Sequence, residues 1–296
     1  MKYRSEIDGL RALAVIPVIL FHAGFEFFSG GFVGVDVFFV ISGYLITTIL
    51  IEDIKNKRFS ITNFYERRAR RILPALIFTL ILIAFLSWLF LPPPDMRSVF
   101  QQLTSNAFFT SNFHYTLTWG YFDSWTLPPI FLNSWSIAVE EQFYLIIPLL
   151  LALFQKHTRN LVVVLVCLSL ASIVTMNLLD NTSPKANYYL LPSRFWELSL
   201  GALLAYFVKY KAYQVAKIRH FLPSWIVLFM LFVLATIFVS YNDAIPYPSN
   251  WTIPVVLITA AIILLVEQAS FTGRILSNRF IVYIGKLSYP LYLLHF

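Results

Sequence analysis

Long, nearly uncharged apolar runs recur along this 296-residue chain, and they restrict its fold more than any other feature. Each run approaches the roughly 20 residues that a helix needs to cross the hydrocarbon core of a bilayer. The chain is 12% charged, about half the fraction of a soluble domain. Because no strands of alternating polarity are apparent, we predict an all-α, polytopic transmembrane helical bundle. Its nine predicted spans cover residues 11–28, 33–51, 72–91, 137–154, 161–179, 195–208, 223–241, 251–267 and 280–296.

The positions of the basic residues predict how the bundle is oriented. With the N-terminus in the cytoplasm, 19 of the 22 Lys and Arg residues fall on the cytoplasmic side, and only Arg97, Lys185 and Arg194 fall outside. Membrane proteins carry such an excess in their cytoplasmic loops, so we predict a cytoplasmic N-terminus. The same distribution accounts for the net charge of +7 without a nucleic-acid partner.

The stretch from Asp8 to Leu45 holds three ionisable groups that lipid tolerates poorly: Arg11, His22 and Asp36. Arg11 and His22 are eleven residues apart, which places them on nearly the same helix face and about 16 Å apart along its axis. If Arg11 lies at one membrane surface, His22 lies near the middle of the bilayer. An ionisable residue at that depth is a candidate functional group.

An imidazole such as that of His22 titrates near neutrality and can accept a proton from a hydroxyl group. A carboxylate on its other ring nitrogen would fix the tautomer, and Asp36 and Glu140 are the candidates for this role. A tight turn at residues 29–31 could bring Asp36 to the level of His22. The histidines lack the spacing of metal ligands, so no metal site is predicted.

Two neighbouring carboxylates, Glu140 and Glu141, stand at the outer end of the fourth predicted span. Ser136, Glu140 and Tyr144 follow each other at intervals of four residues, so they share one helix face. Since neighbouring residues on a helix point in different directions, we expect Glu141 to face solvent.

The most basic segment ends in Arg67, Arg68, Arg70 and Arg71, directly before the third predicted span. These arginines either only set the orientation of the chain or form an anion site at its cytoplasmic mouth, because guanidinium groups bind phosphate oxygens in a fork. Coenzyme A would fit such a site, and so would the head groups of membrane lipids.

The predicted outer segment 92–136 is long enough to have structure of its own. It is either an aromatic belt at the membrane interface or a groove whose rings face the apolar faces of a sugar and whose amides face its hydroxyls. Its rings and polar groups include Asn106, Asn112, His114, Trp119, Tyr121, Asp123, Trp125 and Asn133.

Three local features predict helix geometry near the end of the chain. Arg194 and Glu197 are three residues apart in the sixth predicted span and are expected to form an ion pair. Gly201 is expected to allow close helix approach, and Pro290 is expected to kink the ninth span.

Several segments together resemble the acyltransferase-3 family of membrane acyltransferases. They are DGLRALAVIPVILFH, GGFVGVDVFFVISGYLI, FYERRARRILP, SWSIAVEEQFYLIIP, SRFWELSLG and GKLSYPLYLLH. The segments occur in the order of the family and extend from Asp8 to His295, nearly the whole chain. Any one of these segments alone is weak evidence for the family, whereas the ordered set is specific to it.

The resemblance implies a ten-helix domain, located in the inner (plasma) membrane as a multi-pass protein. Such a domain uses a cytoplasmic acyl donor, usually acetyl-CoA, to esterify a hydroxyl of a cell-surface glycan such as O-antigen, exopolysaccharide or peptidoglycan. The implied catalytic residues are His22, Glu140 and Asp36. The implied donor-binding residues are Arg11, Arg67, Arg68, Arg70 and Arg71, and the implied substrate-binding residues are Trp135, Ser136, Arg194, Glu197, Tyr289 and His295.

Members of this family continue with at least one more helix after the SYPLYLLH motif, and many add an SGNH-type hydrolase-like domain. We therefore expect residues 1–296 to be one membrane domain that is incomplete at its C-terminus. A proton-coupled transporter is the alternative function, because buried His, Asp and Glu residues also serve as proton relays. Against it, the sequence has no apparent inverted repeat.

Overall fold

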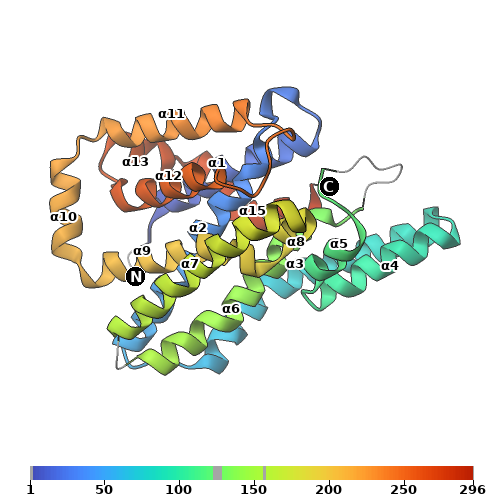
Figure 1. Ribbon diagram of the computed structural model, residues 1–296, viewed down its shortest axis with the longest axis horizontal. Coiled ribbons are helices and arrows are strands. Elements are labelled where there is room, and N and C mark those ends of the chain that lie inside the picture. Colours follow the sequence, from blue (N-terminus) through green and yellow to red (C-terminus); the bar gives the residue numbers. More distant parts are fainter. Residues whose placement is uncertain (1–2, 123–128, 156–157, 296) are drawn as a thin grey trace.

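The computed structural model describes residues 3–122, 129–155 and 158–295, and all regular structure in these ranges is helical (Figure 1). The longer helices are α1 (Ser5–His22), α2 (Gly34–Lys55), α3 (Ile61–Phe90), α4 (Pro93–Ala107), α6 (Trp135–Phe154), α7 (Thr158–Thr182), α9 (Leu191–Tyr210), α11 (Trp225–Ser240) and α12 (Thr252–Leu265). The shorter helices are α5 (Ser111–Thr118), α8 (Pro184–Tyr189), α10 (Ala212–Phe221), α13 (Phe271–Leu276), α14 (Arg279–Lys286) and α15 (Ser288–Leu294), with 3₁₀ turns η1 (Glu26–Phe28), η2 (Gly31–Val33) and η3 (Leu132–Ser134).

Within the described ranges, four segments are long and apolar enough to cross a membrane, namely Gly31–Lys55, Ile61–Phe90, Leu132–Phe154 and Arg159–Thr182. The helices Ala212–Phe221 and Trp225–Ser240 reach this length and apolar character only when they are taken together, and a bend of 86° separates them. The all-α architecture with several apolar helices agrees with the sequence. The count of nine spans and the cytoplasmic N-terminus stay predictions.

The first helix ends at His22 and not at residue 28 as predicted, because Gly24 terminates it. Gly24 has φ of +78°, a left-handed conformation that glycine adopts without steric cost. Its N–H bonds to the Phe21 carbonyl, and the Phe25 N–H bonds to the Leu20 carbonyl. This pair of bonds is the Schellman arrangement that ends many helices. His22 therefore lies in the last turn of α1.

The predicted ninth span is divided into α14 and α15, which meet at Leu287. Pro290 is the third residue of α15 and has no N–H to donate to the carbonyl four residues before it. The interruption lies one turn before the proline, as expected for a helix that a proline breaks.

Glycines hold the two central helices, α2 and α9, close together. A Cβ atom added to Gly43 would lie 1.9 Å from the Leu198 carbonyl oxygen, and one added to Gly201 would lie 2.2 Å from the Val40 carbonyl oxygen. Backbone therefore packs directly on backbone, which confirms the role predicted for Gly201. In a bilayer there is no hydrophobic driving force between helices, so the van der Waals contacts that this close approach allows hold them together.

Replacing Gly43 with alanine is expected to destabilise the fold by about 1–3 kcal/mol, the usual cost of overpacking a core. The new methyl group has no room, so α2 and α9 must separate. Thermal unfolding in detergent would measure the loss. An unchanged midpoint would contradict the close contact of these helices.

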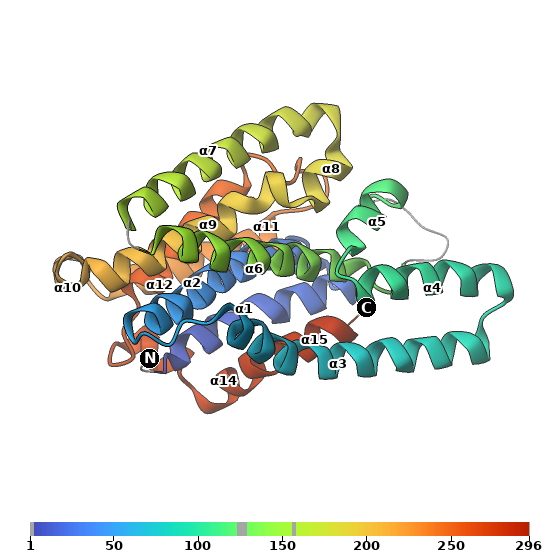
Figure 2. The same ribbon diagram turned by 90° about the horizontal axis from the view of Figure 1, so that it is seen from below.

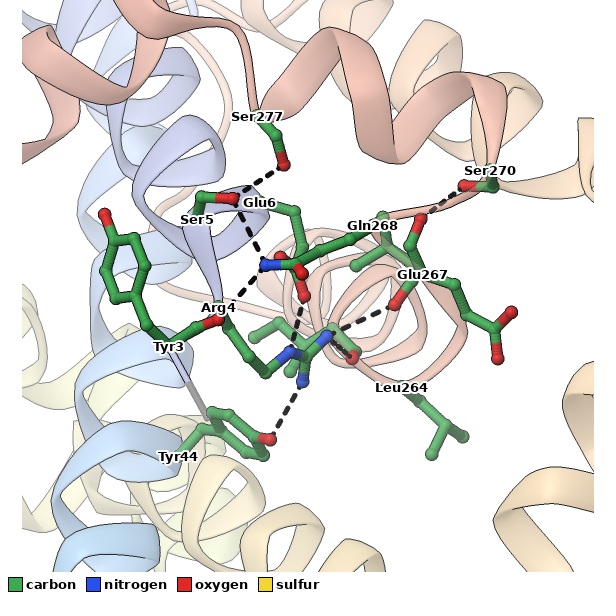
Figure 3. A network of polar contacts seen from close by, with 12 residues as sticks. Tyr3, Arg4, Ser5, Glu6, Tyr44, Leu264, Glu267, Gln268, Ser270 and Ser277 are labelled. Atoms are coloured by element: carbon green, nitrogen blue, oxygen red, sulfur yellow. Dashed lines mark hydrogen bonds and ion pairs between the residues drawn. The ribbon is translucent and has the colours of Figure 1, made fainter. Parts of the chain in front are cut away.

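A polar network around Arg4 fastens the start of α1 to α2 and to the end of α12 (Figure 3). The Arg4 guanidinium donates to Glu6 at 2.6 Å, to the Tyr44 hydroxyl at 2.9 Å and to the Ile263 carbonyl at 3.0 Å. Ser5 also donates to Ser277 at 2.8 Å. These bonds fix where α1 begins along the axis of the bundle, and they thereby fix the positions of Arg11 and His22 along that axis.

Figure 2 shows α3 and α4 as a helical hairpin that extends from one end of the bundle. Val99 and Leu103 of α4 pack with Phe131 in a small apolar cluster. The α4 and α5 helices confirm that segment 92–136 has structure of its own; Asp123 and Trp125 lie outside the described residues.

Candidate active site

One pocket gathers many of the candidate residues from α1, α2, α3, α6 and the α15 region. Its charged lining consists of Arg11, Arg68, Arg71, Glu140 and Glu141. Its hydroxyl-bearing lining consists of Ser42, Ser136, Tyr144, Ser288, Tyr289 and Tyr292. The elements that form it are far apart in sequence, so the fold and not local spacing creates this concentration of charge.

The four clustered arginines divide into two pairs because they lie on a helix and not in a loop. Arg68 and Arg71 line the pocket. Arg67 and Arg70 lie on the exposed side, where they pair with Asp53 at 2.5 Å and with Glu66 at 2.6 Å. A helix turns about 100° per residue, so positions three apart share a face.

The two inward arginines, half-buried Arg68 and exposed Arg71, face the pocket and differ from the outer pair in their partners. Neither Arg68 nor Arg71 forms an ion pair within the described ranges. The Arg68 guanidinium carbon instead lies 5.1 Å from the centre of the Tyr144 ring. Arg11, the third arginine of the pocket, pairs with Asp8 at 3.2 Å. The pocket therefore presents two guanidinium groups that a bound anion can pair with.

The predicted face of Ser136, Glu140 and Tyr144 is confirmed. All three residues line the pocket, and the Tyr144 hydroxyl donates to the Glu140 carboxylate at 2.9 Å. Glu141 also lines the pocket and is half-buried. The expectation that Glu141 faces solvent was therefore wrong, because the pocket between α3 and α6 takes in both carboxylates together with Arg68.

A histidine pair stands next to the pocket. His22 at the end of α1 and His295 after α15 approach to 3.1 Å between His22 Nδ1 and His295 Nε2. His22 Nδ1 is also 2.8 Å from the Val18 carbonyl oxygen, and His22 Nε2 is 2.8 Å from the Tyr121 hydroxyl. Because a carbonyl only accepts, these partners assign the proton to Nδ1 and the lone pair to Nε2.

His295 Nδ1 lies 2.8 Å from the Tyr292 carbonyl oxygen and 3.2 Å from the Asn133 amide nitrogen. The closer carbonyl only accepts, so we place the proton on Nδ1 and the lone pair on Nε2, toward His22; the Asn133 amide donates to the Tyr292 carbonyl instead. The ring nitrogen of His22 that can take up a proton is therefore Nε2, on the side of Tyr121.

Tyr292 connects the histidine pair to the pocket. Its carbonyl accepts from His295 and from the Asn133 amide, while its hydroxyl lies 2.8 Å from Ser136 Oγ and 3.0 Å from the Asn133 carbonyl. The same residue lines the pocket. Tyr289, one turn before it, also lines the pocket and donates to the Ile72 carbonyl at 3.2 Å.

Asp36 belongs to a different, fully buried cluster. Its carboxylate accepts from Arg194 at 2.8 Å and from the Tyr247 hydroxyl at 2.6 Å. Arg194 also pairs with Glu197 at 3.0 Å, which confirms the predicted ion pair on α9. Within the described residues, no contact joins Asp36 to His22, so the turn at residues 29–31 does not bring the two groups together.

Trp135 covers this buried cluster. The centre of its ring lies 5.4 Å from the Arg194 guanidinium carbon, and its side chain is completely buried. Trp135, Arg194 and Glu197 are thus enclosed by the bundle and do not line the pocket. Their predicted contact with substrate stays a prediction that this geometry does not support.

Several residues at the site escaped the sequence analysis. Tyr121 and Asn133 were considered only for an aromatic belt or a sugar groove, and Tyr292 and Ser42 had no assigned role. Tyr292 lies three residues before His295, so the spacing of one helical turn was the available signal. Tyr121 is 99 residues from His22, and no local pattern connects the two.

Comparison with known proteins identifies the class to which this fold and site belong. The family model described as an acyltransferase domain matches residues 4–296. The chain therefore belongs to the acyltransferase-3 family.

Similar proteins are known from several bacteria. Peptidoglycan O-acetyltransferase OatA of Listeria monocytogenes is 36% identical over 306 residues, covering 100% of this chain and 49% of the relative. YrhL of Bacillus subtilis is 34% identical over 310 residues, covering 100% and 48%. O-acetyltransferase OatA of Staphylococcus aureus is 30% identical over 306 residues, covering 100% and 50%. The chain thus spans about half the length of these relatives, and no solved structure matches it.

Proposed function

We propose that this chain transfers an acetyl group from acetyl-CoA to a hydroxyl of a cell-surface glycan, within the cytoplasmic membrane. The observation that carries the proposal is the pocket in which Arg68 and Arg71 form no ion pair with any described carboxylate, next to the pair His22–His295. Family membership supports acyl transfer over a proton-coupled transporter.

The two inward arginines would hold the phosphates of acetyl-CoA. Guanidinium groups bind phosphate oxygens through paired, charge-assisted hydrogen bonds. Arg11 and His22 stand eleven residues apart on α1, which corresponds to about 16 Å. An extended pantetheine arm has a length of this order, so the thioester would reach the histidine while the phosphates stay at the arginines.

His22 would act as the base of the reaction. Its Nε2 takes the proton of the glycan hydroxyl while the hydroxyl oxygen attacks the thioester carbonyl. The new C–O bond forms, the C–S bond breaks, and the proton passes from His22 to the departing thiolate of coenzyme A. His295 would position the His22 ring through the contact at Nδ1. Tyr121 occupies the place on Nε2 that the acceptor hydroxyl would take.

The names of two relatives suggest the class of acceptor. The names of the Listeria and Bacillus proteins both contain the words peptidoglycan O-acetyltransferase. We accordingly propose a glycan of the cell envelope, of the peptidoglycan type, as the acceptor of this chain.

Replacing Arg68 or Arg71 with alanine is expected to weaken acetyl-CoA binding about ten- to a hundredfold. This is the loss expected for a hydrogen bond to a charged group, about 1.5–3 kcal/mol. Equilibrium binding of labelled acetyl-CoA to the purified chain in detergent would measure it.

The same α3 segment supplies matched controls. Arg67→Ala and Arg70→Ala remove the same charge from the exposed pairs with Asp53 and Glu66, so they should leave acetyl-CoA affinity within about twofold, as for other surface ion pairs. Equal losses for all four variants would mean that charge alone attracts the donor. Unchanged affinity in Arg68→Ala and Arg71→Ala would overturn the assignment of the pocket.

A further inference from the structure

A second cleft lies between α4 and α5, outside the pocket described above. It is a wide depression, largely open to the surroundings, with a volume of about 770 Å³. The cleft belongs to segment 92–136, for which the sequence left open either an aromatic belt or a sugar groove. Its lining distinguishes between these two alternatives.

Exposed aromatic rings form one part of the lining. Phe100, Phe108 and Phe113 all line the cleft, with 42%, 74% and 51% of their surface exposed. The face of an aromatic ring carries partial negative charge, and it attracts the C–H groups on the apolar face of a sugar ring. Three such rings around one cleft suit a chain of several sugar units.

Polar groups form the other part, and three of them lack partners within the described residues. Gln101 and Arg97 are exposed and make no hydrogen bond or ion pair there. His114 Nε2 is buried and has no hydrogen-bond partner. The hydroxyls and an acidic substituent of a glycan would satisfy all three.

The cleft is connected to the histidine pair through a short stretch of chain. Thr118 lines the cleft at the end of α5, and Tyr121 bonds to His22 Nε2. Three residues of extended chain span at most about 11 Å. The cleft therefore ends within about 11 Å of the residue that contacts His22.

We propose that this cleft binds the acceptor as a carbohydrate chain bearing acidic groups, with Phe113 under a sugar ring, Gln101 on its hydroxyls and Arg97 on a carboxylate. The inference rests on the proposed function and adds the location of the acceptor. It places acceptor and donor in separate sites, on either side of the histidine pair.

The test measures binding of soluble, uncross-linked peptidoglycan strands to the purified chain in lipid nanodiscs. Phe113→Ala and Gln101→Ala are each expected to raise the dissociation constant about tenfold, while acetyl-CoA binding stays unchanged. Arg97→Ala should weaken binding of these acidic strands and leave binding of neutral N-acetylglucosamine oligomers unaffected. The control is Phe280→Ala on α14, which removes a ring that is 80% exposed.

Cross-linking of the unaltered chain keeps the test valid if a variant fails to fold. A strand carrying a diazirine group should label the peptides of residues 97–118. Labelling of those residues by a photoreactive phospholipid and not by the glycan would overturn the proposal. Equal glycan affinity in all variants, or no glycan binding to the unaltered chain, would overturn it as well. Acetyl transfer in the same nanodiscs reports on the proposed function separately.

Discussion

Replacing His22 with alanine is expected to abolish acetylation of the cell-surface glycan while the protein remains at its normal level. The imidazole is the proposed base, and loss of a positioned base costs about 10²- to 10⁴-fold in rate. Mass analysis of surface glycan from cells that carry the gene with and without His22→Ala would measure the effect.

The control for this variant is His220→Ala, which removes an exposed histidine from α10. It should acetylate the glycan normally. His22→Gln would keep a side chain of similar size but no ring nitrogen that can accept a proton, so it should be as inactive as the alanine variant. Normal acetylation in both His22 variants would end the case for this residue as the base.

Replacing Arg194 with alanine is expected to destabilise the bundle by about 3–5 kcal/mol, the cost of breaking a buried ion pair. The guanidinium lies between Asp36 and Glu197, and the three side chains are at most 1% exposed. Removal of Arg194 would leave two buried carboxylates without their cation. Equilibrium unfolding in mixed micelles would measure the free energy.

Arg70→Ala is the comparison for this variant, because its ion pair with Glu66 is also intrahelical but lies on the surface, with 79% of the arginine side chain exposed. It should cost no more than about 1 kcal/mol. Similar losses in the two variants would contradict the structural role of Arg194. Normal stability of Arg194→Ala together with weakened glycan binding would restore the prediction that this residue contacts substrate.

Local spacing predicted much of what lies within single helices. The i, i+4 face of Ser136, Glu140 and Tyr144, the i, i+3 pair of Arg194 and Glu197, and the close approach at Gly201 are all present in the structure. For the first two, helical geometry alone fixes which residues are neighbours. The Gly201 contact joins α9 to α2, and there the residue type was the signal, because only a small residue allows such close approach.

Contacts between distant segments could not be predicted in this way. Asp36 was a candidate partner of His22 because the two are near in sequence, yet Asp36 bonds to Arg194, 158 residues away. His295 meets His22 across 273 residues. The sequence could have predicted that the arginine cluster divides between two helix faces. That division follows once the helix is extended back to Ser60, whose side chain caps α3 by accepting from the Asn63 N–H.

The central claim is tested most directly by following a labelled acetyl group in vesicles that contain this purified chain, acetyl-CoA and uncross-linked peptidoglycan strands. We expect ester-linked label on the glycan, with one coenzyme A thiol released for each ester formed. Thiol release that continues at the same rate without glycan, or donor that binds at the arginines and never loses its acetyl group, would contradict it.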